Sequence, residues 1–450
     1  IEGGPGAYSY QVTVSDGERA LTRQAGAPAL EEYSMTDLLY NAFVELTGNH
    51  PAWGMLTGIH PVKLLRQYVE ERGEEEGLAH FQGHCYVTPP KAELAHRVLR
   101  AQGPAVEALR ENDFSLYVSI PFCPTRCAYC SFVSADVGRA LKLIDPFLDA
   151  LCRELAATGA MLADAGLRVR TVYFGGGTPD HPLGPPSSTG SWGQLADHID
   201  LSGCTEYTVE AGRPDTITAE KLAVLARRGC SRVSVNPQTM QDAVLERMGR
   251  AHRADDILRA YALARAERHR LHQHGSHRRA ARRQRGGLPR LPGAGAGPGA
   301  GERDGAHPGP EKGLPADGGG GRPALRRGGG GYAGFRLGRL AGAGQRPYYL
   351  YRQKYMSGSF ENVGWCRPGA ESLYNICMME ELHTIVSLGG RRSDQAGRPR
   401  HRVHRAPSQR QIPPGVHPED RRYLRGQGQG GPILRRARKV KEGRHALSAQ

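Results

Sequence analysis

Runs of apolar residues alternate with helix-like patterns between residues 114 and 266. Short apolar runs bounded by turn residues are typical of buried strands, and apolar positions three or four apart are typical of amphipathic helices. The pattern predicts four strands, at Leu116–Ile120, Val169–Phe174, Glu206–Glu210 and Arg232–Val235. It predicts helices at Ile144–Leu162, Thr218–Arg228 and Asp242–Met248. Regular alternation of this kind favours an α/β fold whose parallel sheet closes or partly closes into a barrel.

The flanking segments differ in character from this core. Residues 1–110 are interpreted as a separate mixed α/β region, and the segment Ser372–Leu388 is predicted to be a helix. The aromatic and cationic stretch Tyr348–Tyr355 fits two interpretations equally, a pocket wall for a flat anionic ligand or a strand packed on the core. The expected organisation has five parts: an N-terminal region 1–110, a barrel core 111–268, a Gly/Arg/Pro-rich segment 269–345, a C-terminal segment 346–390 and a basic tail 391–450.

Two of these parts lack the hydrophobic periodicity of a folded chain. Residues 271–344 hold 13 Lys and Arg against 4 Asp and Glu, and residues 391–450 hold 16 against 4. The net charge of +15 therefore comes from these two stretches, and the rest of the chain is mildly acidic. The charge consequently argues against a nucleic acid partner for the patterned part, and the two stretches are expected to be disordered.

We interpret both stretches as products of reading-frame shifts. Codons that encode residues 272–283, read one base later, permit an apolar strand followed by a Gly-Pro turn, and similar shifts are permitted near 186–192 and 411–418. On this hypothesis the later barrel strands are lost, and the chain as written has weak activity or none. The alternative is a genuine Arg/Gly-rich linker that binds RNA, although it lacks the interleaved aromatic residues that such binding uses. The nucleotide sequence distinguishes the two.

Three cysteines, Cys123, Cys127 and Cys130, follow the first predicted strand at the spacing C-x3-C-x2-C. A [4Fe–4S] cluster is normally held by four cysteines, so three thiolates leave one iron open to a ligand that is not protein. A structural zinc site is the weaker interpretation, because it lacks a fourth ligand at suitable spacing. The absence of a disulfide-type cysteine pattern and of a long apolar run predicts a cytoplasmic protein without a membrane partner.

Further candidate residues follow the later strands. The turn after the second strand carries Gly176, Gly177 and Thr178, where glycines let the backbone approach a ligand and offer N–H groups to a carboxylate or phosphate. Glu210 ends the third strand and can accept from an amine or a ribose hydroxyl. Gln238 and Arg250 come after the fourth. Each alone also fits a solvated surface residue or an ordinary turn.

Together these motifs resemble the radical S-adenosylmethionine (SAM) superfamily. Within it they resemble oxygen-independent coproporphyrinogen III oxidase, and most of all the HemZ-type coproporphyrinogen dehydrogenase branch. The resemblance is carried by the cysteines with Leu116–Cys123, by Phe174–Pro179, by Ser234–Gln238 and by Met248–Arg250. Two further segments, Tyr348–Trp365 and the region around Trp53–Pro61, look specific to the branch. The chain departs from the family at two places. Ser119 stands where the family usually has His, and the Asp that the family carries on the strand after the Arg250 motif appears only in the shifted frame near Gly275.

The resemblance implies a partial (β/α) barrel of radical SAM type and two cofactors, a [4Fe–4S] cluster and SAM. It assigns the cluster to Cys123, Cys127 and Cys130, and it leaves the catalytic residues unknown. It assigns SAM contacts to Tyr117, Tyr129, Gly176, Gly177, Thr178, Glu210, Gln238 and Arg250.

The implied reaction is oxygen-independent oxidative decarboxylation. A 5′-deoxyadenosyl radical from SAM abstracts hydrogen from propionate side chains of coproporphyrinogen III, and vinyl groups of protoporphyrinogen IX result. The implied partners are a porphyrinogen substrate and an electron donor such as a flavodoxin or a ferredoxin. Three alternatives stay open: a haem-binding or haem-trafficking protein of the same superfamily, a radical SAM enzyme acting on RNA, and an inactive product of a frame-shifted gene.

Overall fold

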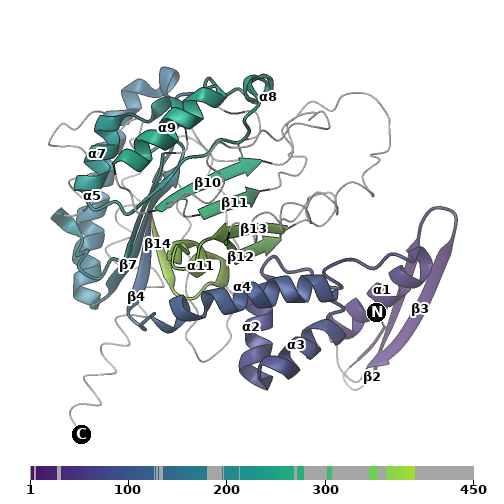
Figure 1. Cartoon of the computed structure of the whole chain (residues 1–450). Coiled ribbons are helices and arrows are strands. Elements are labelled where there is room, and N and C mark those ends of the chain that lie inside the picture. The colour runs from purple at the N-terminus through teal and green to yellow at the C-terminus, as the bar shows by residue number, and fades with distance from the viewer. Residues whose placement is uncertain are drawn as a thin grey trace, which may run out of the picture. The chain divides into compact units, whose positions relative to one another are not determined.

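The structure is a computed structural model, and Figure 1 shows the whole chain. It describes residues 2–4, 7–27, 32–125, 127, 130, 135–179, 195, 197–211, 213–267, 271–277, 302–306, 344–352 and 361–390. The chain divides into two compact units, one of residues 1–101 with 350–362 and the other of residues 102–349 with 363–450. The predictions made for Tyr129, for residues 186–192 and for residues 391–450 fall outside the described residues.

The first unit combines a small antiparallel sheet with helices. Its elements are β1 (Glu2–Gly4), β2 (Ala7–Ser15), β3 (Ala20–Ala27), α1 (Glu32–Thr47), α2 (Pro61–Arg72), α3 (Glu74–Gly83) and the first part of α4 (Pro89–Glu107). Trp53 is fully buried, and its indole Nε1 donates to the carboxylate of Glu361 over 3.2 Å. Lys91 forms an ion pair with the same carboxylate. These contacts tie the segment 350–362 into the unit.

The second unit is built on a nine-stranded sheet. The strand order is β12-β13-β11-β10-β9-β8-β7-β4-β14. Neighbouring strands from β14 through to β11 are parallel, and β13 is antiparallel to β11. The strands are β4 (Asp113–Ile120), β7 (Arg168–Gly176), β8 (Glu206–Glu210), β9 (Arg232–Ser234), β10 (Leu271–His277), β11 (Glu302–Ala306), β12 (Arg346–Arg352), β13 (Glu361–Cys366) and β14 (Thr384–Gly389).

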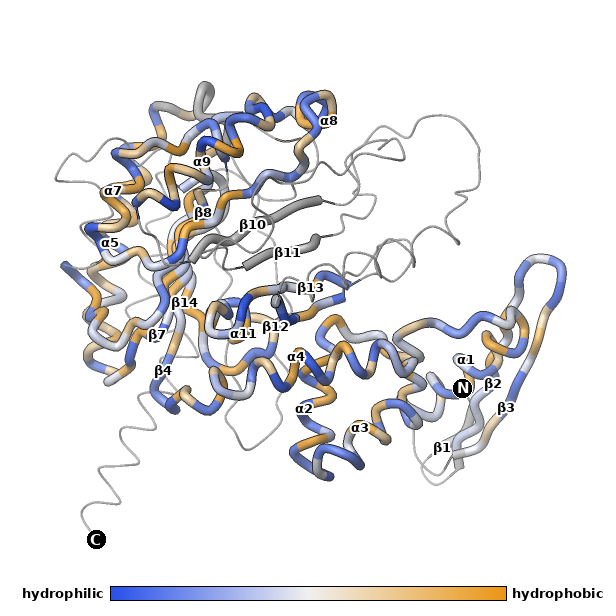
Figure 2. The backbone as a smooth tube through the Cα atoms, in the orientation of Figure 1, coloured by the Kyte–Doolittle hydropathy of each residue, from blue (hydrophilic) through white to orange (hydrophobic). Residues whose placement is uncertain are grey.

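The described helices of this unit contribute to one large hydrophobic core or to smaller clusters beside it. The helices are α5 (Val137–Ala165), α7 (Ala219–Arg227), α8 (Asp242–Arg247), α9 (Ala254–Ala266) and α11 (Leu373–Glu380), with a 3-10 turn η1 (Pro214–Thr216). The large core includes Leu151 and Leu155 of α5, Leu222 of α7, Val118 of β4 and Phe174 of β7. Figure 2 shows the corresponding apolar colouring along these strands and on α5, α7 and α9.

The predicted α/β class with a parallel sheet is confirmed. Each of the four predicted strands coincides with β4, β7, β8 or β9 to within a few residues, and the three predicted helices coincide with α5, α7 and α8. Among the described residues the sheet does not close into a barrel, since β12 and β14 stand at the two ends of the strand order. Among the described helices, none has both the length and the apolarity that crossing a bilayer requires.

The single helix predicted over Ser372–Leu388 is wrong in its second half. The helix α11 ends at Glu380, and Glu381 follows in a left-handed conformation with φ of 52°. The chain then forms β14, which pairs in parallel with β4 from Thr384 to Gly389. A run of β-branched and apolar residues there fits a buried strand, and pairing with β4 overrides its helical propensity.

The structure also differs from the expectation that the later strands are lost. Residues 271–273 pair with β9, and residues 302–306 pair with residues 273–277, both in parallel. Main-chain hydrogen bonds along the free edge of β9 require N–H and C=O groups but no particular side chains, so an unpatterned segment can form them. The residues between these strands, 278–301, and those at 307–343 lie outside the described part.

Candidate functional site

The sequence-predicted site residues lie at or beyond the carboxyl ends of parallel strands. In a parallel sheet these ends meet at one edge, which is where α/β proteins place their functional groups. Ile120 ends β4, Gly176 ends β7, Glu210 ends β8, and Gln238 follows β9 by four residues. The topology therefore brings the predicted motifs to a common edge.

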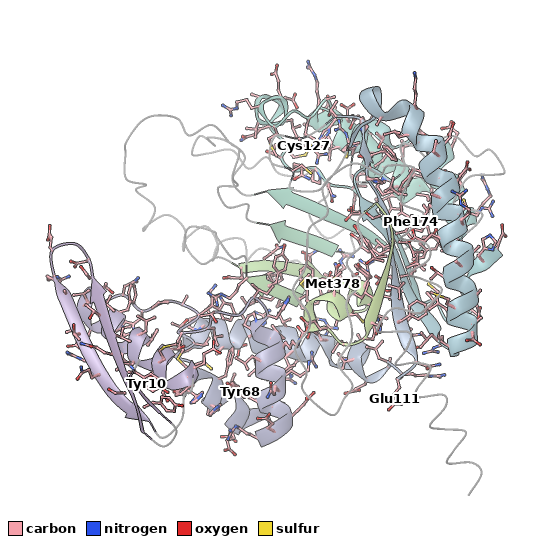
Figure 3. The ribbon with its side chains drawn as sticks, turned by 180° about the vertical axis from the view of Figure 1, so that it is seen from behind. Tyr10, Tyr68, Glu111, Cys127, Phe174 and Met378 are labelled. Atoms are coloured by element: carbon pink, nitrogen blue, oxygen red, sulfur yellow. The ribbon has the colours of Figure 1, made fainter. Side chains whose placement is uncertain are left out.

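The cysteine loop, residues 121–130, begins directly after β4. Cys123 closes β5 (Phe122–Cys123), which pairs with β6 (Ala135–Asp136), and the amide of Cys130 donates to the carbonyl of Cys127 over 3.1 Å. All three cysteines are partly exposed, and Figure 3 marks Cys127. In the described part of the chain, they do not converge with other His, Cys, Asp or Glu side chains into a group that could hold a single metal ion. Each thiolate of an iron–sulfur cluster binds a different iron, so three thiols on one loop fit a cluster without meeting at one point.

The glycine turn is joined to the cysteine loop by hydrogen bonds. The amide of Gly177 donates to the carbonyl of Ile120, and that of Thr178 donates to the carbonyl of Phe122, each over 2.7 Å. The hydroxyl of Thr178 donates to Sγ of Cys123 over 3.5 Å. The two predicted motifs are thus in direct contact.

This contact corrects one expectation about the turn. A Cβ placed on Gly177 would lie 2.4 Å from the carbonyl oxygen of Phe122, so the close approach that this glycine permits is to the chain itself. The amides of Gly177 and Thr178 are already engaged by Ile120 and Phe122. These two amides therefore do not serve a ligand carboxylate, although the sequence suggested that they would.

Glu210 is held by a tyrosine that sequence reasoning did not select. The hydroxyl of Tyr173 donates to Oε1 of Glu210 over 2.6 Å. Complete burial raises the pKa of Tyr173 well above its ordinary value, and the charge of Glu210 raises it further. The tyrosine is therefore a permanent donor to Glu210. Its position on β7, two residues before the run Gly175–Gly177, was the only sequence signal.

Two more tyrosines stack on this pair. The ring of Tyr374, from α11, lies 4.4 Å from that of Tyr173, and the ring of Tyr117 lies 6.1 Å from Tyr173 and 6.3 Å from Tyr374. Met378, labelled in Figure 3, packs against the same cluster. Of the three tyrosines only Tyr117 was predicted, because Tyr374 is some 200 residues away in sequence from the strands that it covers.

Gln238 and Arg250 have distinct surroundings. Gln238 is buried with φ of 59°, a region that few residues other than glycine adopt, and its Oε1 makes no hydrogen bond to any described residue. Strained, unsatisfied polar groups of this kind are common at binding sites. Arg250 directly follows Gly249, whose carbonyl accepts from Thr125 of the cysteine loop over 3.3 Å. Arg213, which sequence reasoning missed, also contacts Thr125.

Comparisons with known proteins identify the family of the chain. A model of the radical SAM superfamily matches residues 117–272. The oxygen-independent coproporphyrinogen-III oxidase-like protein HemZ of Bacillus subtilis is 33% identical over 365 residues, which is 76% of this chain and 70% of HemZ. The heme chaperone HemW of the same organism is 35% identical over 156 residues, covering 34% of this chain and 38% of HemW. The solved structure of coproporphyrinogen III oxidase HemN from Escherichia coli aligns over 66% of this chain and 68% of that chain, with 18% identity and a TM-score of 0.47.

Radical SAM proteins use a [4Fe–4S] cluster and SAM. The donor set of this chain fits that pair, with three thiols on one loop, a threonine hydroxyl on one sulfur, and an oriented carboxylate at the end of β8. The similarity to HemZ extends well beyond the matched superfamily segment. The chain accordingly belongs to the radical SAM superfamily and, within it, to the family of HemZ, the oxygen-independent coproporphyrinogen-III oxidase-like proteins.

Proposed function

We propose that this protein is a radical SAM oxidoreductase that decarboxylates propionate side chains of coproporphyrinogen III to vinyl groups, without oxygen. The observation that carries the proposal is the similarity to HemZ over 76% of the chain, more than twice the share that aligns with HemW. The direct contact between the cysteine loop and the glycine turn supports it, because this joins the two predicted cofactor-binding motifs.

In this proposal the cluster is held by Cys123, Cys127 and Cys130. SAM is contacted by Tyr117, Tyr129, Gly176, Gly177, Thr178, Glu210, Gln238 and Arg250. When bound, the cluster and SAM supply a one-electron cleavage that yields a carbon radical able to abstract hydrogen. Because the Gly177 and Thr178 amides serve the cysteine loop, these two residues contact SAM through other atoms.

The residues of the chain position the cofactors. Tyr173 donates to one oxygen of Glu210 and thereby fixes the orientation of the carboxylate. Glu210 also reaches the glycine turn, because a Cβ on Gly175 would lie 3.2 Å from its Oε2. Thr178 donates to the sulfur of Cys123, and such bonds tune the reduction potential of a cluster. The remaining partners of the proposal are a porphyrinogen and an electron donor such as a flavodoxin or a ferredoxin.

A haem-binding or haem-trafficking role is the second candidate. It is favoured by the 35% identity to HemW over 156 residues. That similarity covers only about a third of each chain, so it supports this candidate less than the similarity to HemZ supports the first.

The test is an anaerobic assay of the full chain reconstituted with iron and sulfide. Coproporphyrinogen III, SAM and dithionite are added, and protoporphyrinogen IX and 5′-deoxyadenosine are quantified. HemN of Escherichia coli is the positive control, and Cys123→Ser is the negative control. Formation of both products by the chain but not by the variant is expected. Stoichiometric haem binding without decarboxylation would favour the second candidate, and the lack of both would fit the hypothesis of a frame-shifted product.

A further inference from the structure

A buried arginine outside the predicted site holds the cysteine loop. The side chain of Arg213, which follows β8, is only 4% exposed. Its Nη1 donates to the carbonyl of Thr125 over 3.2 Å and to the hydroxyl of Thr125 over 2.7 Å. Thr125 lies between Cys123 and Cys127, so one guanidinium nitrogen contacts both the backbone and the side chain in the middle of the loop.

The guanidinium of Arg213 is itself held in place by Asp215. Nε and Nη2 of Arg213 donate to the two carboxylate oxygens of Asp215, over 3.1 Å and 2.8 Å. This paired geometry is the strong, directional form of an arginine–carboxylate contact. His252, which is buried, lies 3.6 Å from Oδ1 of Asp215. Burial alone would raise the pKa of Asp215, but His252 and Arg213 hold that pKa well below its usual range, so the carboxylate stays charged.

Thr125 is held on a second side as well. Its hydroxyl, which accepts from Arg213, donates to the carbonyl of Gly249 over 3.3 Å. The loop is thus attached to two connections that are distant in sequence, the one after β8 and the one between α8 and α9. The Thr125 hydroxyl accepts one hydrogen bond and donates another, so one orientation of the side chain satisfies both bonds.

We propose that Arg213 is a positioning residue that, through Thr125, holds the segment between Cys123 and Cys127 in the conformation that accepts the cluster. The inference rests on the proposed function, because it takes the cysteines as cluster ligands. A loop that carries several ligands loses conformational freedom when the cluster binds, and contacts that order it beforehand reduce that loss. Arg213 and Asp215 are suited to this positioning role because their contact with each other does not involve the cluster.

The experiment compares two pairs of variants with a matched control. Thr125→Val removes the hydroxyl and keeps the shape, whereas Thr125→Ser keeps the hydroxyl. Arg213→Ala removes the guanidinium, and Arg213→Lys keeps the charge but not the fork. The control is Arg168→Ala, which breaks another arginine–carboxylate contact, Nε of Arg168 to Asp113 over 2.6 Å, at the opposite ends of β4 and β7.

Two readouts are used besides activity. In the cluster-free chain, the alkylation rates of Cys123, Cys127 and Cys130 by iodoacetamide are measured by peptide mass spectrometry. In the reconstituted chain, iron and sulfide per chain and the electron paramagnetic resonance spectrum of the reduced cluster are measured. Urea denaturation of every variant reports its stability.

We expect Arg213→Ala and Thr125→Val to alkylate about tenfold faster, the scale for losing a hydrogen bond to a charged group, and to retain less than half of the iron. Thr125→Ser and Arg168→Ala should behave as the parent chain in both readouts, even where Arg168→Ala loses as much stability. Equal alkylation rates and iron contents in Thr125→Val, Thr125→Ser and the parent would overturn the inference. This comparison does not depend on Arg213→Ala, so it decides the question even if that variant fails to fold. A parent chain that takes up no cluster would instead contradict the proposed function.

Discussion

Oε1 of Glu210, at the end of β8, accepts a 2.6 Å hydrogen bond from the hydroxyl of Tyr173 on the neighbouring strand β7. The donor is buried and stays protonated, because burial and the adjacent charge raise its pKa well above the ordinary tyrosine value. A carboxylate that is predicted to contact SAM is therefore fixed before any ligand arrives. The stack of Tyr374 on Tyr173 extends this support to the C-terminal segment.

Replacement of Tyr173 by Phe should weaken SAM binding while the fold persists. The variant removes one charge-assisted hydrogen bond to Glu210, and we expect about a tenfold rise in the dissociation constant, measured by calorimetry on the reconstituted protein. Tyr207→Phe is the control, since the Tyr207 hydroxyl is buried without a hydrogen-bond partner among the described residues. Equal affinities in the two variants would contradict a role for the Tyr173–Glu210 bond.

Gly177→Ala should separate the glycine turn from the cysteine loop. The added methyl would meet the Phe122 carbonyl at 2.4 Å, and overpacking of this kind costs about 1–3 kcal/mol. We expect a lower urea midpoint and a reduced iron content after reconstitution. Gly103→Ala, inside α4 with open space around it, is the control and should be neutral or slightly stabilising. A Gly177→Ala protein with parental iron content would show that cluster uptake does not need the contact between the glycine turn and the cysteine loop.

The buried His383 should make the protein less stable in mild acid. Its Nε2 lies 2.7 Å from the hydroxyl of Ser115, and Sγ of Cys377 lies 3.9 Å from its Nδ1. Burial lowers the pKa of His383 from 6.5 to about 4, while Asp113 raises it and Arg170 lowers it by their charges. Between these values the unfolded chain binds more protons than the folded one, so stability falls as the pH drops from 6.5 to 4.

The loss in the free energy of unfolding that is attributable to His383 is about 3 kcal/mol at its largest, and above pH 6.5 His383 causes no such loss. Urea denaturation at intervals from pH 4 to pH 7 measures it. His383→Gln keeps a polar group near Ser115 but does not titrate, so its pH dependence should be shallower by this amount. Parallel curves for the two proteins would show that another group is responsible.

Glu206→Gln should destabilise the second unit. The Glu206 carboxylate accepts from the Ser372 hydroxyl and the Leu373 and Tyr374 amides, at the start of α11, over 2.9, 2.7 and 3.2 Å. It also lies 3.6 Å from the fully buried guanidinium of Arg232. Loss of its charge removes the carboxylate that faces this buried cation, at a cost of about 3–5 kcal/mol in the free energy of unfolding.

Chemical denaturation checks this value against Glu220→Gln, a change to an exposed carboxylate in the first turn of α7. The control should stay close to the parent, because its side chain is in solvent. The Tyr374 ring should also lose its order over Tyr173 when α11 loosens, which near-ultraviolet circular dichroism can follow. A Glu206→Gln protein as stable as the parent would mean that Arg232 finds compensation elsewhere.

Much of the parallel sheet could be predicted from sequence because its signal is local. Apolar runs at β4, β7, β8 and β9 are long enough to be recognised without knowledge of their neighbours. The second half of Ser372–Leu388 was predicted wrongly because Thr384–Gly389 becomes a strand only through its partner β4. Likewise, residues 271–277 and 302–306 carry no strand pattern, and their pairing depends on the free edge of β9.

The sequence by itself determined the cysteine spacing, the glycine turn and the family, since these are patterns along a few covalently linked residues. Only the tertiary structure decided what surrounds them. It showed that Gly177 faces the chain's own backbone, that Tyr173 and Tyr374 support Glu210, and that Arg213 contacts Thr125. Such contacts join residues tens to hundreds of positions apart, and their partners are selected by the packing of the sheet, which no local pattern encodes.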